Sequence, residues 1–201
     1  MNFLAHIYLS ENDSFVQIGN FMADGIRGKE YENYPTKIKI GILLHRFIDS
    51  YTDAHPIFRQ STKKLHATYG HYSGVLIDMF YDHFLCKNWS TYSDEPLHDF
   101  VQRFYHTLED NYNLLSDKTK HLLPYMTKAD WLYNYQFLDK LEIILCQMDN
   151  RTKTNSNMRF AIADLKKHYT DFENEFTLFF EEIRLAAHQK LQELQNEYPS
   201  S

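Results

Sequence analysis

The chain has 201 residues, a formal net charge of −6 at pH 7 and 43% hydrophobic residues. This length suits one domain with a sizeable core, so we expect residues 1–201 to form a single domain. The negative charge argues against a nucleic-acid-binding protein, which needs a positive field. No stretch approaches the roughly 18 apolar residues of a membrane-spanning helix, and the first residues lack a secretory signal pattern. We therefore expect a cytoplasmic protein that binds neither nucleic acid nor membrane.

The predicted elements are all helices. Glycine and proline are few, with six and five residues, and apolar residues recur at spacings of three and four. We predict an all-α, single-domain helical bundle with helices, in chain order, over residues 2–9, 15–26, 36–55, 57–69, 74–88, 97–115, 136–149 and 170–197. Loops are predicted at 89–96 and 150–157, and a less regular aromatic segment around Pro124, Trp131 and Tyr135.

The stretch 41–56, GILLHRFIDSYTDAHP, carries the first chemical signal. His45, Asp49 and Asp53 follow one another at four-residue intervals, which places them on one stripe of a helix. Acids and imidazoles beside a core-facing surface are costly unless they are paired, and one divalent cation can pair several of them. An ordinary helix ion pair between His45 and Asp49 explains that pair equally well.

The stretch 74–85, GVLIDMFYDHFL, repeats the pattern. Asp78 and Asp82 share a face and repel each other, and neither has a Lys or Arg four residues away. His83 follows Asp82 directly, and although neighbours on a helix point about 100° apart, both can reach an ion beside the helix. The pattern favours metal binding or catalysis.

The remaining signals are weaker. Asp24 is compatible with a polar residue at a helix end, and His6 lies in an apolar segment, where a lone histidine is more often a core group. No phosphate-binding glycine loop, G-x-S-x-G or C-x-x-C motif is present. Mixed imidazole and carboxylate ligands suit Mn²⁺, Fe²⁺ or Zn²⁺, and an excess of oxygen ligands favours Mn²⁺ or Mg²⁺. Such a site predicts metal-assisted hydrolysis.

Basic residues are concentrated in one tract. Residues 27–64, hereafter the basic tract, hold eight Lys and Arg against four Asp and Glu. A local positive patch favours an anionic substrate or an acidic partner, while a solvated helix face is an equally good explanation.

Four ordered motifs carry a resemblance to a known family. They are NFLAH at 2–6, GNFMAD at 19–24, the stretch 41–56, and IDMFYDHFL at 77–85 followed by Trp89. Together they resemble the acyl carrier protein phosphodiesterases, over nearly the whole chain in length and order, although the part after about residue 95 matches only in helical character.

The resemblance implies a function. Such enzymes hydrolyse the phosphodiester that joins 4′-phosphopantetheine to a serine of holo acyl carrier protein, with Mn²⁺ as the usual cofactor. They are considered relatives of the HD-type metal phosphohydrolases, which implies an HD-domain-like bundle. Those enzymes carry a His-Asp doublet, whereas this chain has Asp82 and His83 in the reverse order.

These observations give one set of predicted site residues. The metal ligands are Asp24, His45, Asp49, Asp82 and His83, and the catalytic residues are Asp78 as a further ligand or general base, Arg46 as a phosphate-binding group and His6 in a supporting role. Acyl carrier proteins are strongly acidic, so the basic tract is the expected docking surface for the holo form. Two alternatives stay open: a helical metal phosphohydrolase acting on a nucleotide or small phosphate ester, and a binding module whose acids form structural ion pairs.

Overall fold

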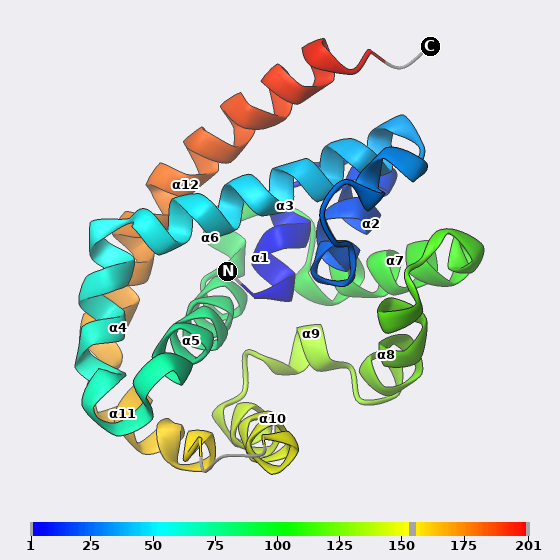
Figure 1. Ribbon diagram of the computed structural model, residues 1–201. Coiled ribbons are helices and arrows are strands. Elements are labelled where there is room, and N and C mark those ends of the chain that lie inside the picture. Colours follow the sequence, from blue (N-terminus) through cyan, green and yellow to red (C-terminus); the bar gives the residue numbers. More distant parts are fainter. Residues whose placement is uncertain (1, 153–155, 200–201) are drawn as a thin grey trace.

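The structure, a computed structural model, describes residues 2–152 and 156–199. The regular elements in this part of the chain are all helices (Figure 1), which confirms the all-α prediction. The α-helices are α1 (Phe3–Tyr8), α2 (Ser14–Met22), α3 (Thr36–Ala54), α4 (Pro56–Tyr69), α5 (Ser73–Lys87), α6 (Trp89–Tyr92), α7 (Leu97–Asp110), α8 (Asp117–Lys128), α9 (Trp131–Asn134), α10 (Leu138–Arg151), α11 (Ala161–Lys167) and α12 (Tyr169–Glu197). Short 3-10 helices are η1 (Ala23–Gly25), η2 (Glu30–Asn33), η3 (Gly70–Tyr72), η4 (Tyr112–Leu114) and η5 (Met158–Phe160).

Several helices begin at residues that favour a helix start. The side chain of Asp13 accepts hydrogen bonds from the backbone N–H groups of Phe15 and Val16 and thereby caps α2. Ser116 caps α8 in the same way. Pro56 occupies the first turn of α4, where its missing N–H leaves no helical bond unmade. Local chemistry therefore sets these boundaries.

Two predicted loops are partly helical. Residues 89–96 contain α6, because the indole of Trp89 is buried and its Nε1 donates a hydrogen bond to the carbonyl oxygen of Glu95 at 2.7 Å. The first two residues of the predicted loop 150–157 belong to α10. Residues 153–155 lie outside the described residues.

Pro124 lies inside α8, not in an irregular segment. Proline removes one backbone hydrogen bond from a helix interior. The helix nevertheless continues because Leu123 and Met126, on either side, are both buried against the rest of the molecule. Tertiary packing here overrides local preference.

Helices α2 and α3 cross at a distance that only glycine permits. A Cβ on Gly19 would lie 2.1 Å from the carbonyl oxygen of Ile38, and one on Gly41 would lie 2.2 Å from that of Val16. No real side chain comes so close to backbone atoms, so both positions need glycine. The close crossing brings Asn20 of α2 beside the N-terminal half of α3.

One continuous hydrophobic core joins helices from both ends of the chain, from Leu4 in α1 to Leu194 in α12. The long helices α3 and α12 lie side by side (Figure 1). Helix α1 packs between α2 and α5 and is buried along most of its six residues. A helix this short is not stable alone, so its neighbours determine its position. Among the described helices, none combines the length and apolar character needed to span a bilayer.

Candidate functional site

Two histidines and an aspartate meet where α1 approaches α3. Nε2 of His6 lies 3.2 Å from Oδ1 of Asp49, and Nε2 of His45 lies 3.0 Å from Oδ2 of Asp49. The two imidazole rings are stacked, with centroids 4.1 Å apart. One potential ligand atom from each residue lies within 4.8 Å of the others. We refer to His6, His45 and Asp49 as the cluster.

Asp24 places a second carboxylate beside the cluster. Its Oδ1 lies 3.3 Å from Nε2 of His45, and its Oδ2 lies 3.5 Å from Nζ of Lys118. Gly25 permits this arrangement, because a Cβ there would lie 2.9 Å from Oγ of Ser116 at the start of α8. The site therefore draws on α1, η1 and α3, with the first turn of α8 next to it.

Asn20 fixes the orientation of the His6 ring. Its Nδ2 donates to the carbonyl oxygen of His6 at 2.9 Å and to Oγ of Ser10 at 2.8 Å. Its Oδ1, which lies 2.7 Å from Nδ1 of His6, must therefore accept a proton from that nitrogen. In the neutral ring, Nε2 of His6 then bears a lone pair beside Asp49.

Burial and charge separate the pKa values of the two imidazoles. Burial, reinforced by nearby His45, lowers the pKa of His6 to about 4 although Asp49 opposes the shift. Burial also acts to lower the pKa of His45, but the carboxylates of Asp24 and Asp49 outweigh it and raise this pKa to about 9. At neutral pH, His6 is therefore neutral and His45 is charged.

The pKa values of the two carboxyl groups, Asp24 and Asp49, are both lowered. The hydrogen bond from His45 lowers the pKa of Asp24 to about 2. Burial opposes ionisation of Asp49, but the hydrogen bond from charged His45, together with the nearby His6 ring, holds its pKa well below the usual range. Both carboxylates are therefore negatively charged at neutral pH.

This donor set fits a divalent cation. Neutral His6 and ionised Asp49 place two electron pairs 3.2 Å apart, and the proton of His6 is on the far side of its ring. One divalent cation can accept an electron pair from each of these atoms. Imidazole nitrogens together with carboxylate oxygens suit Mn²⁺, Fe²⁺ and Zn²⁺.

Asp82 caps α1 instead of joining the cluster, which corrects its predicted role as a ligand. Its two carboxylate oxygens accept hydrogen bonds from the backbone N–H groups of Leu4 at 2.8 Å and Ala5 at 3.1 Å. An N-cap side chain normally accepts these bonds, but Asn2 makes no such bond within the described chain. Burial raises the pKa of Asp82 to about 7, although both hydrogen bonds oppose this shift. Asp82 thus positions the helix that carries His6.

His83 faces away from the cluster, which corrects its predicted role as well. Its Nδ1 lies 2.8 Å from the carbonyl oxygen of Tyr135, and its Nε2 lies 2.7 Å from the hydroxyl of Tyr169. Burial lowers the pKa of His83. Because protein groups engage both ring nitrogens, neither is available to an ion at the cluster.

Of the predicted catalytic residues, Asp78 lines the cavity beside the cluster and Arg46 does not. Burial raises the pKa of the Asp78 carboxyl group. Arg46 is not among the described residues of that cavity. Its Nη2 donates to the carbonyl oxygen of Ile26 at 3.2 Å, and its guanidinium lies 5.0 Å from the ring centroid of Tyr31. The predicted contact of Arg46 with phosphate therefore does not fit this geometry.

The cavity has a volume of about 500 Å³ and combines a charged wall with an apolar one. The cluster, Asp24, Asp53 and Asp78 form the charged wall. Apolar side chains that line the rest include Met79, Leu122, Trp131, Ile144 and Met148. Such a cavity can hold an elongated ligand that has a charged end and an uncharged remainder.

Two positively charged side chains line this cavity although no sequence motif indicates them. Lys118 lies in the first turn of α8, and Arg151 is the last residue of α10. Neither belongs to a motif, and both reach the cavity only because α8 and α10 fold against the site. Asn20 has a partial signal, its four-residue spacing from Asp24, but its side chain contacts His6 instead.

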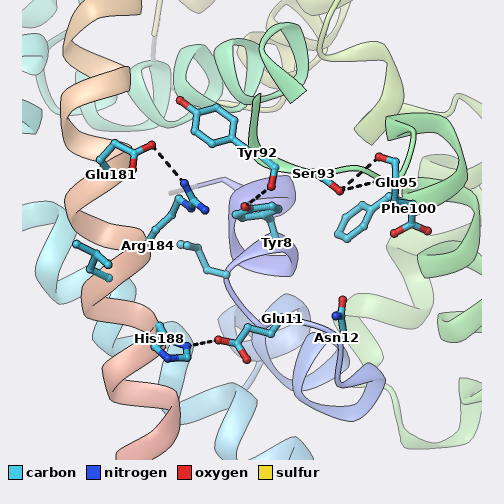
Figure 2. Close-up of a pocket in the computed structure, with 12 residues that line it drawn as sticks. Tyr8, Glu11, Asn12, Tyr92, Ser93, Glu95, Phe100, Glu181, Arg184 and His188 are labelled. Carbon is cyan, nitrogen blue, oxygen red and sulfur yellow. Dashed lines mark hydrogen bonds and ion pairs between the residues drawn. The ribbon is translucent and has the colours of Figure 1, made fainter. Parts of the chain in front are cut away.

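A second cavity, of about 480 Å³, lies near the C-terminal end of α1 (Figure 2). Charged side chains there form two ion pairs, Arg184 with Glu181 and His188 with Glu11 (Figure 2). Among the described residues, the cluster is the only group that brings three or more potential metal ligands close together. The candidate chemistry therefore belongs to the first cavity.

The basic tract is distributed over α3, α4 and the segment before them. Lys37 forms an ion pair with Asp13 at 2.7 Å, and Lys64 pairs with buried Glu175. Its basic side chains are not among those that line either described cavity. Docking of a partner on the basic tract stays a prediction.

Fold and site define an all-helical protein with a histidine–aspartate cluster in the wall of a cavity. The sequence profile of the family described as acyl carrier protein phosphodiesterase matches residues 1–183. The chain belongs to this family, which confirms the resemblance seen in the four motifs, and the family name indicates a phosphodiesterase. The likeness to HD-type enzymes stays a prediction.

Individual relatives match along most of their length. Acyl carrier protein phosphodiesterases from Pectobacterium atrosepticum and Photorhabdus laumondii are each 30% identical to this chain, covering 95% and 90% of it and 100% and 91% of their own lengths. The protein of that name from Yersinia enterocolitica is 29% identical over 94% of this chain and 99% of its own. No solved structure is significantly similar to the chain.

Proposed function

We propose that this protein hydrolyses the phosphodiester bond between 4′-phosphopantetheine and holo acyl carrier protein and releases the apo carrier protein. Family membership supports phosphodiesterase activity on an acyl carrier protein. The cluster supports a metal-dependent reaction, because it offers several ligand atoms to one ion.

The contact between Nε2 of His6 and Oδ1 of Asp49 carries the metal proposal. These atoms are 3.2 Å apart, and the hydrogen bond to Asn20 keeps the His6 proton on the opposite nitrogen. His6, His45 and Asp49 are the proposed ligands, with Asp24 as a fourth. Mn²⁺ is the expected ion, and the same donors admit Fe²⁺ or Zn²⁺ and, with lower preference, Mg²⁺.

In the proposed reaction, the charged and the apolar walls of the cavity have different roles. A divalent cation at the cluster would polarise a phosphoryl oxygen and lower the pKa of an attacking water. Asp78 is the proposed general base, because burial raises its pKa towards the range in which proton transfer at neutral pH is efficient. The apolar side chains, such as Leu122 and Trp131, would bind the uncharged part of the prosthetic group.

Mass spectrometry of the carrier protein tests this proposal. Holo acyl carrier protein incubated with this protein and Mn²⁺ should lose its prosthetic group, and Asp49→Asn should abolish the loss. Asp139→Asn is the matched control, because Asp139 lies on α10 with a side chain that is 75% exposed. Nucleotides and small phosphate esters are assayed in parallel. Cleavage of those compounds without loss of the prosthetic group would contradict the proposed substrate.

The docking site of the carrier protein needs a separate test. Lys63 in α4 is exposed, so Lys63→Glu changes the charge of the basic tract at little structural cost. Lys64 is unsuitable, because its reversal would place a second negative charge beside buried Glu175. If the basic tract binds the carrier protein, Lys63→Glu raises KM and leaves kcat unchanged. An unchanged KM at low ionic strength would argue against docking at this position.

A further inference from the structure

The site presents an electrostatic problem for a phosphodiester. Asp24, Asp49, Asp53 and Asp78 all line the cavity. Of these, Asp24 and Asp49 each place a carboxylate oxygen beside Nε2 of His45, at 3.3 and 3.0 Å. A negatively charged phosphate is repelled by such a wall, and one divalent cation offsets only part of this charge.

Lys118 and Arg151 are cations that line the same cavity. They come from α8 and α10, whereas the proposed ligands come from α1, η1 and α3. Among the described residues, Lys118 forms one ion pair, the 3.5 Å contact with Asp24, between side chains that are 61% and 51% exposed. Exposed pairs of this kind are weak, so Lys118 keeps donors for a ligand.

Arg151 has the geometry that phosphate recognition uses. Its guanidinium offers paired N–H donors that match two oxygens of one phosphate. None of the ion pairs found between described residues involves Arg151, although α10 carries Asp139 and Asp149, which pair with Lys140 and Arg159. Arg151 is exposed and lines the cavity, so its guanidinium can be reached by an anionic ligand that enters from solvent.

We infer that Lys118 and Arg151 bind the non-bridging oxygens of the substrate's phosphodiester. This inference rests on the proposed function for the identity of the substrate, but not for the chemistry of the ligand, which is a phosphate group. Lys118 also approaches Asp24, so its ammonium group links the phosphate to the carboxylate wall. The two cations take the role that the sequence pattern suggested for Arg46.

Phosphate binding can be measured without catalysis. The variants are Lys118→Met and Arg151→Met, which remove the charge and keep an unbranched apolar stem. Lys120→Met on α8 and Lys140→Met on α10 are matched controls: Lys120 lies over the ring of Tyr112, Lys140 pairs with Asp139, and neither lines the cavity among the described residues. Each protein is titrated with Mn²⁺ alone and then, loaded with Mn²⁺, with inorganic phosphate, 4′-phosphopantetheine and pantetheine.

Each cavity variant should bind inorganic phosphate and 4′-phosphopantetheine about tenfold or more weakly than the unmodified protein, because a charge-assisted hydrogen bond is lost. Its affinity for Mn²⁺ should not fall, its affinity for pantetheine should stay unchanged, and both controls should behave like the unmodified protein. Equal phosphate affinity in all variants would overturn the inference, and so would a parallel loss of Mn²⁺ affinity. If phosphate binding depends on the two cations but no prosthetic group is released, the proposed function fails and the anion site stands.

Discussion

Replacing Asp82 by Ala tests whether this carboxylate holds α1 instead of an ion. The side chain is fully buried and accepts hydrogen bonds from the N–H groups of Leu4 and Ala5 at 2.8 and 3.1 Å. Leaving a buried donor without a partner costs about 1–3 kcal/mol. Two such donors predict that the free energy of unfolding falls by about 2–6 kcal/mol, a large part of the stability of an ordinary domain.

Urea unfolding of metal-free protein at about pH 8, followed by circular dichroism, measures this loss. At this pH the Asp82 carboxylate, with a pKa of about 7, is mostly ionised. Asp49→Ala is the comparison, because the Asp49 side chain is 44% exposed and should lose less stability without metal. Mn²⁺ at about 100 times its Kd should stabilise the unmodified protein by about 2.7 kcal/mol and leave Asp49→Ala unaffected. Unchanged metal-free stability of Asp82→Ala, together with loss of the Mn²⁺ effect, would refute the capping role and restore Asp82 as a ligand.

Three further predictions concern the same region. Asn20→Leu removes the acceptor for Nδ1 of His6, so Mn²⁺ affinity should fall about 10–100-fold in a metal titration, whereas unchanged affinity would exclude an orienting role. The His45 ring must lose a proton to bind an ion, and its pKa in the metal-free protein is about 9. Mn²⁺ affinity should therefore rise about tenfold per pH unit up to about pH 9. An affinity that stays constant from about pH 7 to 9 would contradict this prediction. The same proton stabilises the metal-free protein most fully below about pH 6.5, and this contribution is lost as pH rises through the raised pKa. Gly41→Ala would put a Cβ 2.2 Å from the carbonyl oxygen of Val16. Urea unfolding should therefore show that the free energy of unfolding falls by about 3 kcal/mol or more. A decrease below about 1 kcal/mol would show that α2 and α3 can move apart freely.

Most helices could be predicted from local sequence, because their signals are local. Asp13 marks the start of α2 through its own side chain, and Pro56 begins α4. The prediction failed at Pro124, where buried neighbours hold a helix that proline disfavours. Packing between distant segments decides such cases, and local sequence patterns do not predict that packing.

In the candidate site, too, some contacts could be predicted from local sequence and others could not. The spacing of His45 and Asp49 determined by itself that both side chains share one face of α3, because a helix returns to the same face every four residues. The identical spacing of Asp78 and Asp82 could not show that Asp82 faces the end of α1, 77 to 78 residues away in the chain. That contact depends on how α5 packs against α1.

The sequence alone therefore determined most of the long helices and which side chains share a face of each. Only the tertiary structure decided that His6 and Asp24 approach His45, that His83 points to two tyrosines, and that Lys118 enters the cavity. The physical reason is that backbone hydrogen bonding within a helix acts over about four residues, whereas the direction in which a helix face points is set by burial against segments elsewhere in the chain.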